Sequence, residues 1–221
     1  LIRAAEQIAA PRRLQPALET WLKCPVPLID SDDPRHLVEV LSALSAQTNA
    51  VVLASGDPLW FGIGRILAER LGPERLRFHP APTCLQLAFA RIGRPWQDAR
   101  WVSLHGRDPE PLARELQTRP RALAVLTDPG RGGADTVRRC LRSSGLEASY
   151  QLWLGENLGR ADERMRLIPA DAPLPEPLQP LLVALLIAEE PSIPNSRALP
   201  LFGLEDGLYL QHPDHPGLMT K

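Results

Sequence analysis

Residues 51–64 of the chain read VVLASGDPLWFGIG. The first four residues are apolar and include two β-branched valines, a pattern typical of a strand covered on both faces of a parallel sheet. The tetrapeptide at 55–58 then breaks the strand and starts a turn toward a helix. Ligands of open α/β sheets bind beyond the carboxyl ends of the strands. Gly56 and Asp57 therefore mark either a ligand site or an ordinary strand-to-helix turn.

The composition is that of a globular protein with room for one large domain or two small ones. The chain has 221 residues, of which 44% are hydrophobic and 23% charged, as in soluble proteins generally. Its net charge of -1 gives no electrostatic footprint for nucleic acid. The longest apolar run, residues 181–188, is far shorter than the roughly 20 residues of a membrane span. We therefore expect neither nucleic acid nor membrane as a partner.

The basic residues are almost all arginine, since lysine occurs only at positions 23 and 221. Arginine suits bidentate recognition of carboxylates or phosphates. A genome-wide coding bias accounts for the same composition. The bias between the two basic residues therefore does not by itself identify a ligand.

The cysteines and histidines give no pattern of metal ligands. Cys24, Cys84 and Cys140 are far apart and lack the paired spacing of a metal or redox motif. We interpret them as reduced thiols of a cytoplasmic protein. His212 and His215 are close together, but a zinc site normally needs three or four ligands. The sequence therefore predicts no metal site.

Helical and strand-like segments alternate through the first two thirds of the chain, and strands dominate thereafter. Asp33 followed by Pro34 predicts a capped helix, and Thr83 to Gln86 has the form of a capping box. Gly145 is a natural helix terminator. We expect strands at 51–54, 75–79, 101–104, 122–126, 149–154, 163–168 and 181–188, and helices at 1–10, 34–44, 60–71, 85–92, 110–116 and 133–143.

This change of pattern predicts two α/β domains of different character. The boundaries that it indicates are residues 1–106 for the first domain and 107–190 for the second. The tail, residues 191–221, is rich in proline and weakly periodic. We interpret the tail as an interdomain linker.

Several segments, in order, resemble the tetrapyrrole (corrin/porphyrin) methylases. The resemblance is closest to members that methylate C-5 of a precorrin macrocycle in cobalamin biosynthesis, and it covers most of residues 14–190. Any one motif is only moderately specific, whereas five in the right order are strong. The matching segments are 55–62, 80–88, 103–107, 126–129, and 155–159 with 162–164.

The resemblance implies a fold, a cofactor and a set of contacts. The family has two α/β domains with S-adenosylmethionine (SAM) and the macrocycle in the cleft between them, usually in a homodimer. The first amides of a helix capped by Thr83 are free donors that suit a polar ligand group. The SAM contacts implied by the resemblance are Ser55, Gly56, Asp57, Trp60, Thr83, Cys84, Leu126, Asn157 and Leu158.

The implied chemistry is an in-line displacement in which an electron-rich meso carbon attacks the SAM methyl group. Positioning supplies most of the rate of such a reaction, and a dry apolar pocket suits the dispersal of the sulfonium charge. Asp57 is the candidate catalytic acid that orients the substrate or handles a proton, or it merely stabilises its turn. Because precorrins carry many carboxylates, Arg107 and His105 are candidate substrate contacts. Solvated surface for Arg107 and a hydrogen-bonded loop residue for His105 are the alternatives.

Both ends of the chain depart from the family pattern. Family members begin with a strand and a glycine-rich loop, and neither appears before Leu1, so we expect the first strand to be missing. Residues 216–221 resemble the entrance to a second catalytic domain, which carries out the C-15 methylation and a decarboxylation. The chain would then be the first module of a longer protein, with that domain as a partner.

Two other classes of function stay open. The same superfamily includes methyltransferases that act on ribosomal RNA and on the precursor of diphthamide, and the SAM-side motifs do not separate these. The net charge of -1 argues against RNA. The missing first strand also admits a non-catalytic module that only docks a partner domain.

Overall fold

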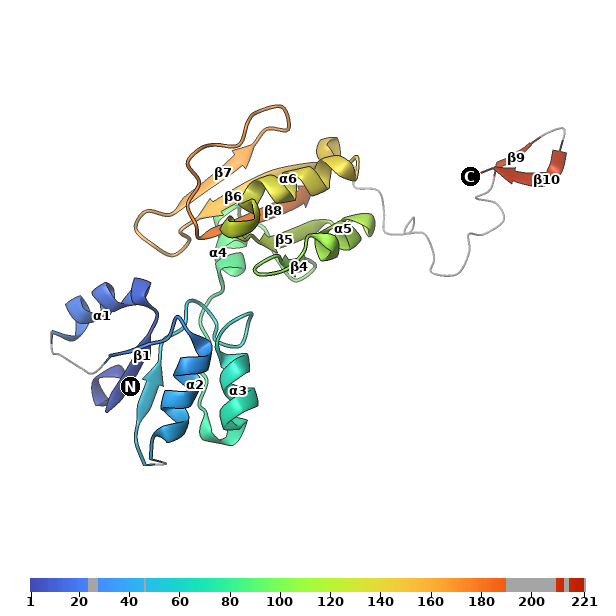
Figure 1. Cartoon of the computed structure of the whole chain (residues 1–221). Helices are drawn as coiled ribbons and strands as arrows, with labels where there is room; N and C mark the ends of the chain where they lie inside the picture. Colours follow the sequence, from blue (N-terminus) through green and yellow to red (C-terminus); the bar gives the residue numbers. More distant parts are fainter. Residues whose placement is uncertain (24–27, 46, 190–209, 213–214, 221) are drawn as a thin grey trace. The chain divides into compact units, whose positions relative to one another are not determined.

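The structure is a computed structural model that describes residues 1–23, 28–45, 47–189, 210–212 and 215–220 (Figure 1). The chain divides into two compact units between Ala90 and Arg91, each with its own sheet. This division comes earlier in the chain than the boundary at 106 that the sequence pattern indicates. The reason is that β4, Arg100–Ser103, pairs in parallel with β5, Ala122–Leu126, and so belongs to the second sheet.

The first unit contains a three-stranded parallel sheet in the order β2-β1-β3. Ile8 of the central strand lies opposite Leu28 on one side and Val51 on the other. The strands are β1 Gln7–Ala10, β2 Leu28–Asp30 and β3 Ala50–Val52, and the helices are α1 Gln15–Leu22, α2 Pro34–Ala43, α3 Gly64–Leu71 and α4 Cys84–Arg91, the last of which ends in the second unit. Short 3-10 turns occur at Ile2–Ala4, Arg12–Leu14 and Pro73–Arg75.

Helices cover both faces of this sheet. Successive side chains of a strand point to opposite faces, and Ala9 packs with Leu37 of α2 and Leu67 of α3. Ile8 packs with Leu18 of α1 on the other face. The first unit is therefore a three-layer α/β fold with a parallel sheet, as the segment at 51–64 predicts.

The helix predicted at 1–10 is wrong, because residues 7–10 form the central strand of the sheet. A short apolar run fits either a buried strand or a helix turn, and only the distant pairing partners β2 and β3 decide between them. The strand predicted at 75–79 is also absent, since a 3-10 turn and extended loop occupy these residues. β2 is a strand that the sequence pattern misses, and α3 begins at Gly64 rather than at residue 60.

The second unit contains a five-stranded mixed sheet in the order β4-β5-β8-β6-β7, in which only β4 and β5 are parallel. One face of the sheet packs against α5 and α6 through a core that includes Leu112, Val137 and Leu154. The remaining elements are β6 Tyr150–Glu156, β7 Arg164–Ile168, β8 Leu182–Ala188, α5 Glu110–Gln117 and α6 Gly133–Ser143, with 3-10 turns at Pro129–Arg131 and Glu147–Ser149. Five strands and two helices of this unit agree with the sequence prediction to within two residues.

The tail contains two short antiparallel strands, β9 Leu210–His212 and β10 His215–Thr220. Residues 190–209, which carry most of the predicted linker, lie outside the described residues. No helix in the described ranges is long and apolar enough to cross a membrane.

Candidate functional site

The carboxyl ends of β1, β2 and β3 meet at one edge of the first sheet, because the three strands are parallel. Each strand runs there into a loop with polar side chains. β1 continues into Arg12 and Arg13, and β3 continues into Ser55. This is the edge at which ligands of open α/β sheets bind.

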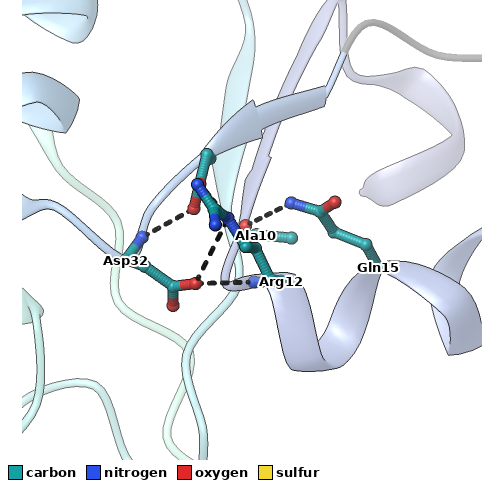
Figure 2. Close-up of polar contacts among 5 residues, drawn as sticks. Ala10, Arg12, Gln15 and Asp32 are labelled. Carbon is teal, nitrogen blue, oxygen red and sulfur yellow. Dashed lines mark hydrogen bonds and ion pairs between the residues drawn. The ribbon is translucent and has the colours of Figure 1, made fainter.

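An ion-pair network joins the loops after β1 and β2 (Figure 2). The Nε of Arg12 donates to Oδ2 of Asp30 at 2.6 Å, and its backbone amide donates to Oδ2 of Asp32 at 3.2 Å. The amide of Asp32 donates to Oδ1 of Asp30 at 2.9 Å. This amide, followed by the Arg12 guanidinium, holds the pKa of Asp30 below its ordinary value. The network fixes the two loops relative to each other.

A second polar contact joins the loop after β1 to the loop after β3. Nη2 of Arg13 donates to Oγ of Ser55 at 2.7 Å. Ser55 is exposed, and it directly precedes Gly56. The contact places an arginine beside the first of the predicted SAM contacts.

Gly56 brings the motif after β3 against the segment before α4. Its φ is +71°, and a Cβ atom built on it would lie 3.3 Å from the carbonyl oxygen of Pro82 and 3.6 Å from Cα of Thr83. A glycine allows this approach without crowding, and its positive φ is one that other residues rarely adopt. Two of the predicted contact segments, 55–57 and 83–84, therefore lie side by side in the first unit.

The start of α4 is a capping box, as the sequence predicts. The amide of Gln86 donates to Oγ1 of Thr83 at 3.2 Å, and the amide of Thr83 donates to Oε1 of Gln86 at 2.8 Å. Burial raises the pKa of the Cys84 thiol, against the opposing effect of the Leu85 and Cys84 amides. Cys84 is therefore a neutral thiol at neutral pH, suited to packing rather than to nucleophilic attack.

The carboxylate of Asp57 stabilises the turn that follows β3. Its Oδ1 accepts the amide of Leu59 at 2.8 Å, which is the turn-stabilising role that the sequence leaves open. The turn closes where the amide of Gly64 donates to the carbonyl of Pro58 at 2.8 Å. One acceptor of Asp57 is thus engaged, and its half-buried side chain lies at the ligand edge of the sheet.

Trp60 and Phe61 form an aromatic pair in this turn. Their ring centroids are 4.7 Å apart at an interplanar angle of 84°, the edge-to-face arrangement that aromatic quadrupoles favour. Trp60 is half-buried and Phe61 is exposed. The turn therefore presents apolar surface next to the polar groups of Ser55 and Asp57.

In the second unit, Leu126 and Asn157 lie at one edge of the sheet. Leu126 is the last residue of β5 and pairs with Val183, whereas Asn157 follows β6, whose last residue pairs with Leu182. Nδ2 of the buried Asn157 donates to Oδ2 of Asp162 at 2.7 Å. The Asn157 side chain therefore holds the loop between β6 and β7.

Leu158, in the same loop, packs over the backbone near the end of β6. A Cβ atom on Gly155 would lie 2.9 Å from Cδ1 of Leu158 and 3.1 Å from the Met165 sulfur. The loop is further fixed by Arg91, whose guanidinium pairs with Glu163 at 2.5 Å. Asn157 and Leu158, two of the predicted SAM contacts, therefore belong to a loop that a hydrogen bond and an ion pair fix in place.

His105 and Arg107 lie in the loop between β4 and α5, and both are exposed. Between them the amide of Gly106 donates to Oδ2 of Asp128 at 2.8 Å. This hydrogen bond, then the one from Gly130, and then the charges of His105 and Arg131 hold the pKa of Asp128 below its ordinary value. Asp128 therefore joins the predicted substrate loop to the end of β5.

We expect replacement of Asp128 by asparagine to destabilise the second unit at neutral pH and to have no effect in acid. A carboxylate with a lowered pKa contributes stability above its unfolded pKa of about 4 and loses it as the pH falls through the folded value. Urea unfolding of both proteins at neutral and acid pH measures this. Asp108→Asn, in the same region and 88% exposed, is the control. An equal deficit of Asp128→Asn at both pH values would contradict the expectation.

Two features of the second unit are not predicted from the sequence. Glu156, with no exposed surface, pairs with Arg166 of β7 and accepts the amide of Gln179 at 2.9 Å. A cavity of about 660 Å³ opens beside α6, lined by residues that include Thr127, Ala134, Leu174, Leu178, Gln179 and Leu182. None of the predicted site residues lines this cavity. Among the described residues, no three His, Cys, Asp or Glu side chains gather as a metal site would require.

Residues 1–172 match the family model described as Tetrapyrrole (Corrin/Porphyrin) Methylases. The chain belongs to the tetrapyrrole methylases. This tetrapyrrole methylase is 37% identical over 85% of its length to precorrin-6Y C(5,15)-methyltransferase (decarboxylating) of Sinorhizobium sp, and 35% identical over 55% of its length to cobalt-precorrin-7 C(5)-methyltransferase of Salmonella typhimurium. It spans 43% and 58%, respectively, of the length of these relatives.

A solved structure shares the fold of the tetrapyrrole methylase. It is uroporphyrin-III C-methyl transferase of Thermus thermophilus in complex with S-adenosylhomocysteine, which superposes with a TM-score of 0.59 at 20% identity. The match covers 85% of this chain and 87% of the other. The comparison confirms the predicted fold class of two α/β domains.

Proposed function

We propose that this tetrapyrrole methylase transfers a methyl group from SAM to C-5 of a precorrin macrocycle in cobalamin biosynthesis. The proposal rests on the names of the two relatives, each of which specifies methylation at C-5. One name specifies a precorrin and the other a cobalt-precorrin. The proposal therefore commits to the ring position and leaves the presence of cobalt to experiment.

In the first unit, the proposed SAM contacts are Ser55, Gly56, Asp57 and Trp60 after β3, with Thr83 and Cys84 at the start of α4. Support comes from the close approach of Gly56 to the Pro82–Thr83 backbone, which makes one continuous surface at the ligand edge. In the second unit, the proposed contacts are Leu126, Asn157 and Leu158. His105 and Arg107 are the proposed contacts to substrate carboxylates.

The reaction forms a carbon–carbon bond while the bond between the methyl group and sulfur breaks. The electron pair of the broken bond stays on sulfur, and the proton of the meso carbon is lost afterwards. The apolar faces of Leu59, Trp60 and Phe61 suit a reaction in which the sulfonium charge disperses. The residues of the chain contribute chiefly by holding the methyl group and the carbon in line.

Asp57 is the proposed acid or base near the reacting carbon, and Asp57→Asn tests it. Asparagine keeps an oxygen that can accept the Leu59 amide, so the turn should survive, and the affinity for S-adenosylhomocysteine then reports separately on the proposed SAM contact of Asp57. We expect kcat to fall about tenfold, below the hundredfold or more of an ideally placed acid or base. Steady-state kinetics and calorimetry measure the two quantities. A wild-type kcat with normal affinity would leave Asp57 only its role in the turn.

The assay of the proposed function incubates the full chain with carbon-13-methyl SAM and either a cobalt-free or a cobalt-containing precorrin. We expect one labelled methyl group at C-5 by NMR. Calorimetry with S-adenosylhomocysteine separates an enzyme from a docking module, since a docking module should show no binding. Salt-sensitive retention of RNA on filters would instead support the RNA methyltransferase alternative.

The name and length of one relative bear on the partners of this chain. The Sinorhizobium relative is named for methylation at two positions and for decarboxylation, and the chain spans 43% of its length. We therefore propose that the chain works with a C-15-methylating, decarboxylating domain. A homodimer in the cytoplasm is the expected form, and sedimentation of the purified chain tests the oligomeric state.

A further inference from the structure

Two consecutive arginines follow β1, and their surroundings differ. Arg12 is paired with Asp30 at 2.6 Å and faces Asp32 at 4.0 Å. Arg13 donates to Ser55, a neutral hydroxyl. Among the described residues, no carboxylate lies within ion-pair distance of Arg13. One guanidinium is thus neutralised by the protein, and its neighbour is not.

Arg13 lies where a ligand of the sheet would bind. It lies at the carboxyl edge of the parallel sheet, where Ser55 anchors one of its nitrogens. A guanidinium has five N–H donors in a planar fork, and one Ser55 oxygen engages one of them. Arg13 is exposed, so its remaining donors can reach a ligand, and Arg12 of the same 3-10 turn is paired separately with Asp30 and Asp32. Such a fork matches the geometry of a carboxylate.

We propose that Arg13 binds a carboxylate group of the ligand that occupies this edge. The inference rests on the proposed function, which supplies two carboxylate sources: the side chains of the precorrin, and the amino-acid end of SAM. Ser55 acts as the positioning partner of Arg13. The Arg12 pairs with Asp30 and Asp32 keep the loop in place, so Arg12 itself is not a ligand contact.

Arg13→Ala and Arg13→Lys, made in the full chain, test the proposal. A charge-assisted bidentate contact contributes enough that its loss weakens binding about tenfold. If the precorrin supplies the carboxylate, Arg13→Ala raises its KM about tenfold and leaves the affinity for S-adenosylhomocysteine unchanged. If SAM supplies it, the affinity for S-adenosylhomocysteine falls about tenfold instead. Arg13→Lys keeps the charge but loses the fork, so its effect should be intermediate.

The control is Arg70→Ala, which removes the same charge from an exposed position at the last turn of α3. It should behave as the wild type. Ser55→Ala removes both the anchor and a proposed SAM contact, so the anchor is read from the precorrin KM, which should rise by part of the Arg13→Ala effect without a loss of thermal stability. Wild-type KM and affinity in Arg13→Ala would overturn the proposal while leaving the proposed function intact. A wild-type chain that neither binds S-adenosylhomocysteine nor methylates would contradict the proposed function itself.

Discussion

Replacing Gly64 by alanine should lower the free energy of unfolding of the first unit by about 3 kcal/mol, the upper part of the range for overpacking. Gly64 is buried at the start of α3, and a Cβ atom there would lie 2.5 Å from the carbonyl oxygen of Pro58 and 2.9 Å from Cε1 of Phe78. The nearest atom is backbone, so the turn itself must move. In an uncrowded helix interior the same change would stabilise by about 0.5–1 kcal/mol. The expected effect therefore has the opposite sign to helix propensity.

The same substitution should also weaken the proposed cofactor surface. The amide of Gly64 closes the turn by donating to Pro58, and that turn directly follows Asp57. Urea unfolding and calorimetry with S-adenosylhomocysteine measure the two effects. Gly64 is not among the glycines with positive φ, so a loss of stability would report crowding. Gly93→Ala, in the second unit, shows the cost of backbone strain without crowding, because Gly93 has a φ of +63° and nothing within 4 Å of a Cβ atom. A Gly64→Ala variant as stable as the wild type would show that the 58–64 turn adjusts freely.

Local signals in the sequence predict the elements whose structure depends on neighbouring residues. Asp33 caps α2 by accepting the amides of Arg35 and His36, and Thr83 with Gln86 forms the predicted box. α6 spans 133–143, as its apolar spacing and Gly145 indicate. In these cases, the interactions that fix the element lie within a few residues of it.

The features that the sequence does not show depend on pairing between distant segments. β1 becomes the central strand only because β2 and β3 flank it, and the ligand edge therefore begins at Arg12 and Arg13 rather than at Ser55. A helix predicted over residues 1–10 leaves no strand end before Arg12 and Arg13, so the sequence pattern does not place either arginine at the ligand edge. The contact of Gly56 with Thr83 is similarly invisible, although each motif is recognisable by itself.

Arg166→Met should lower the free energy of unfolding of the second unit by about 3 kcal/mol, as is typical when one partner of a buried ion pair is removed. Glu156 has no exposed surface, whereas the Arg166 side chain is 33% exposed. Removing the arginine therefore leaves a fully buried carboxylate, whose remaining donor is the Gln179 amide. Arg164→Met is the matched control, because Arg164 is exposed on the same strand and surface changes usually stay within about 0.5 kcal/mol.

A double-mutant cycle separates the ion pair from packing. Glu156→Gln keeps an acceptor for the Gln179 amide and removes the negative charge, so Glu156→Gln combined with Arg166→Met should recover much of the stability that Arg166→Met loses alone. Additive losses in urea unfolding would contradict this expectation, because they would mean that the two side chains act independently. Since Asn157 directly follows Glu156, recovery of stability should be accompanied by recovery of affinity for S-adenosylhomocysteine. The buried pair would then be what holds the Asn157 loop in the form that the cofactor requires.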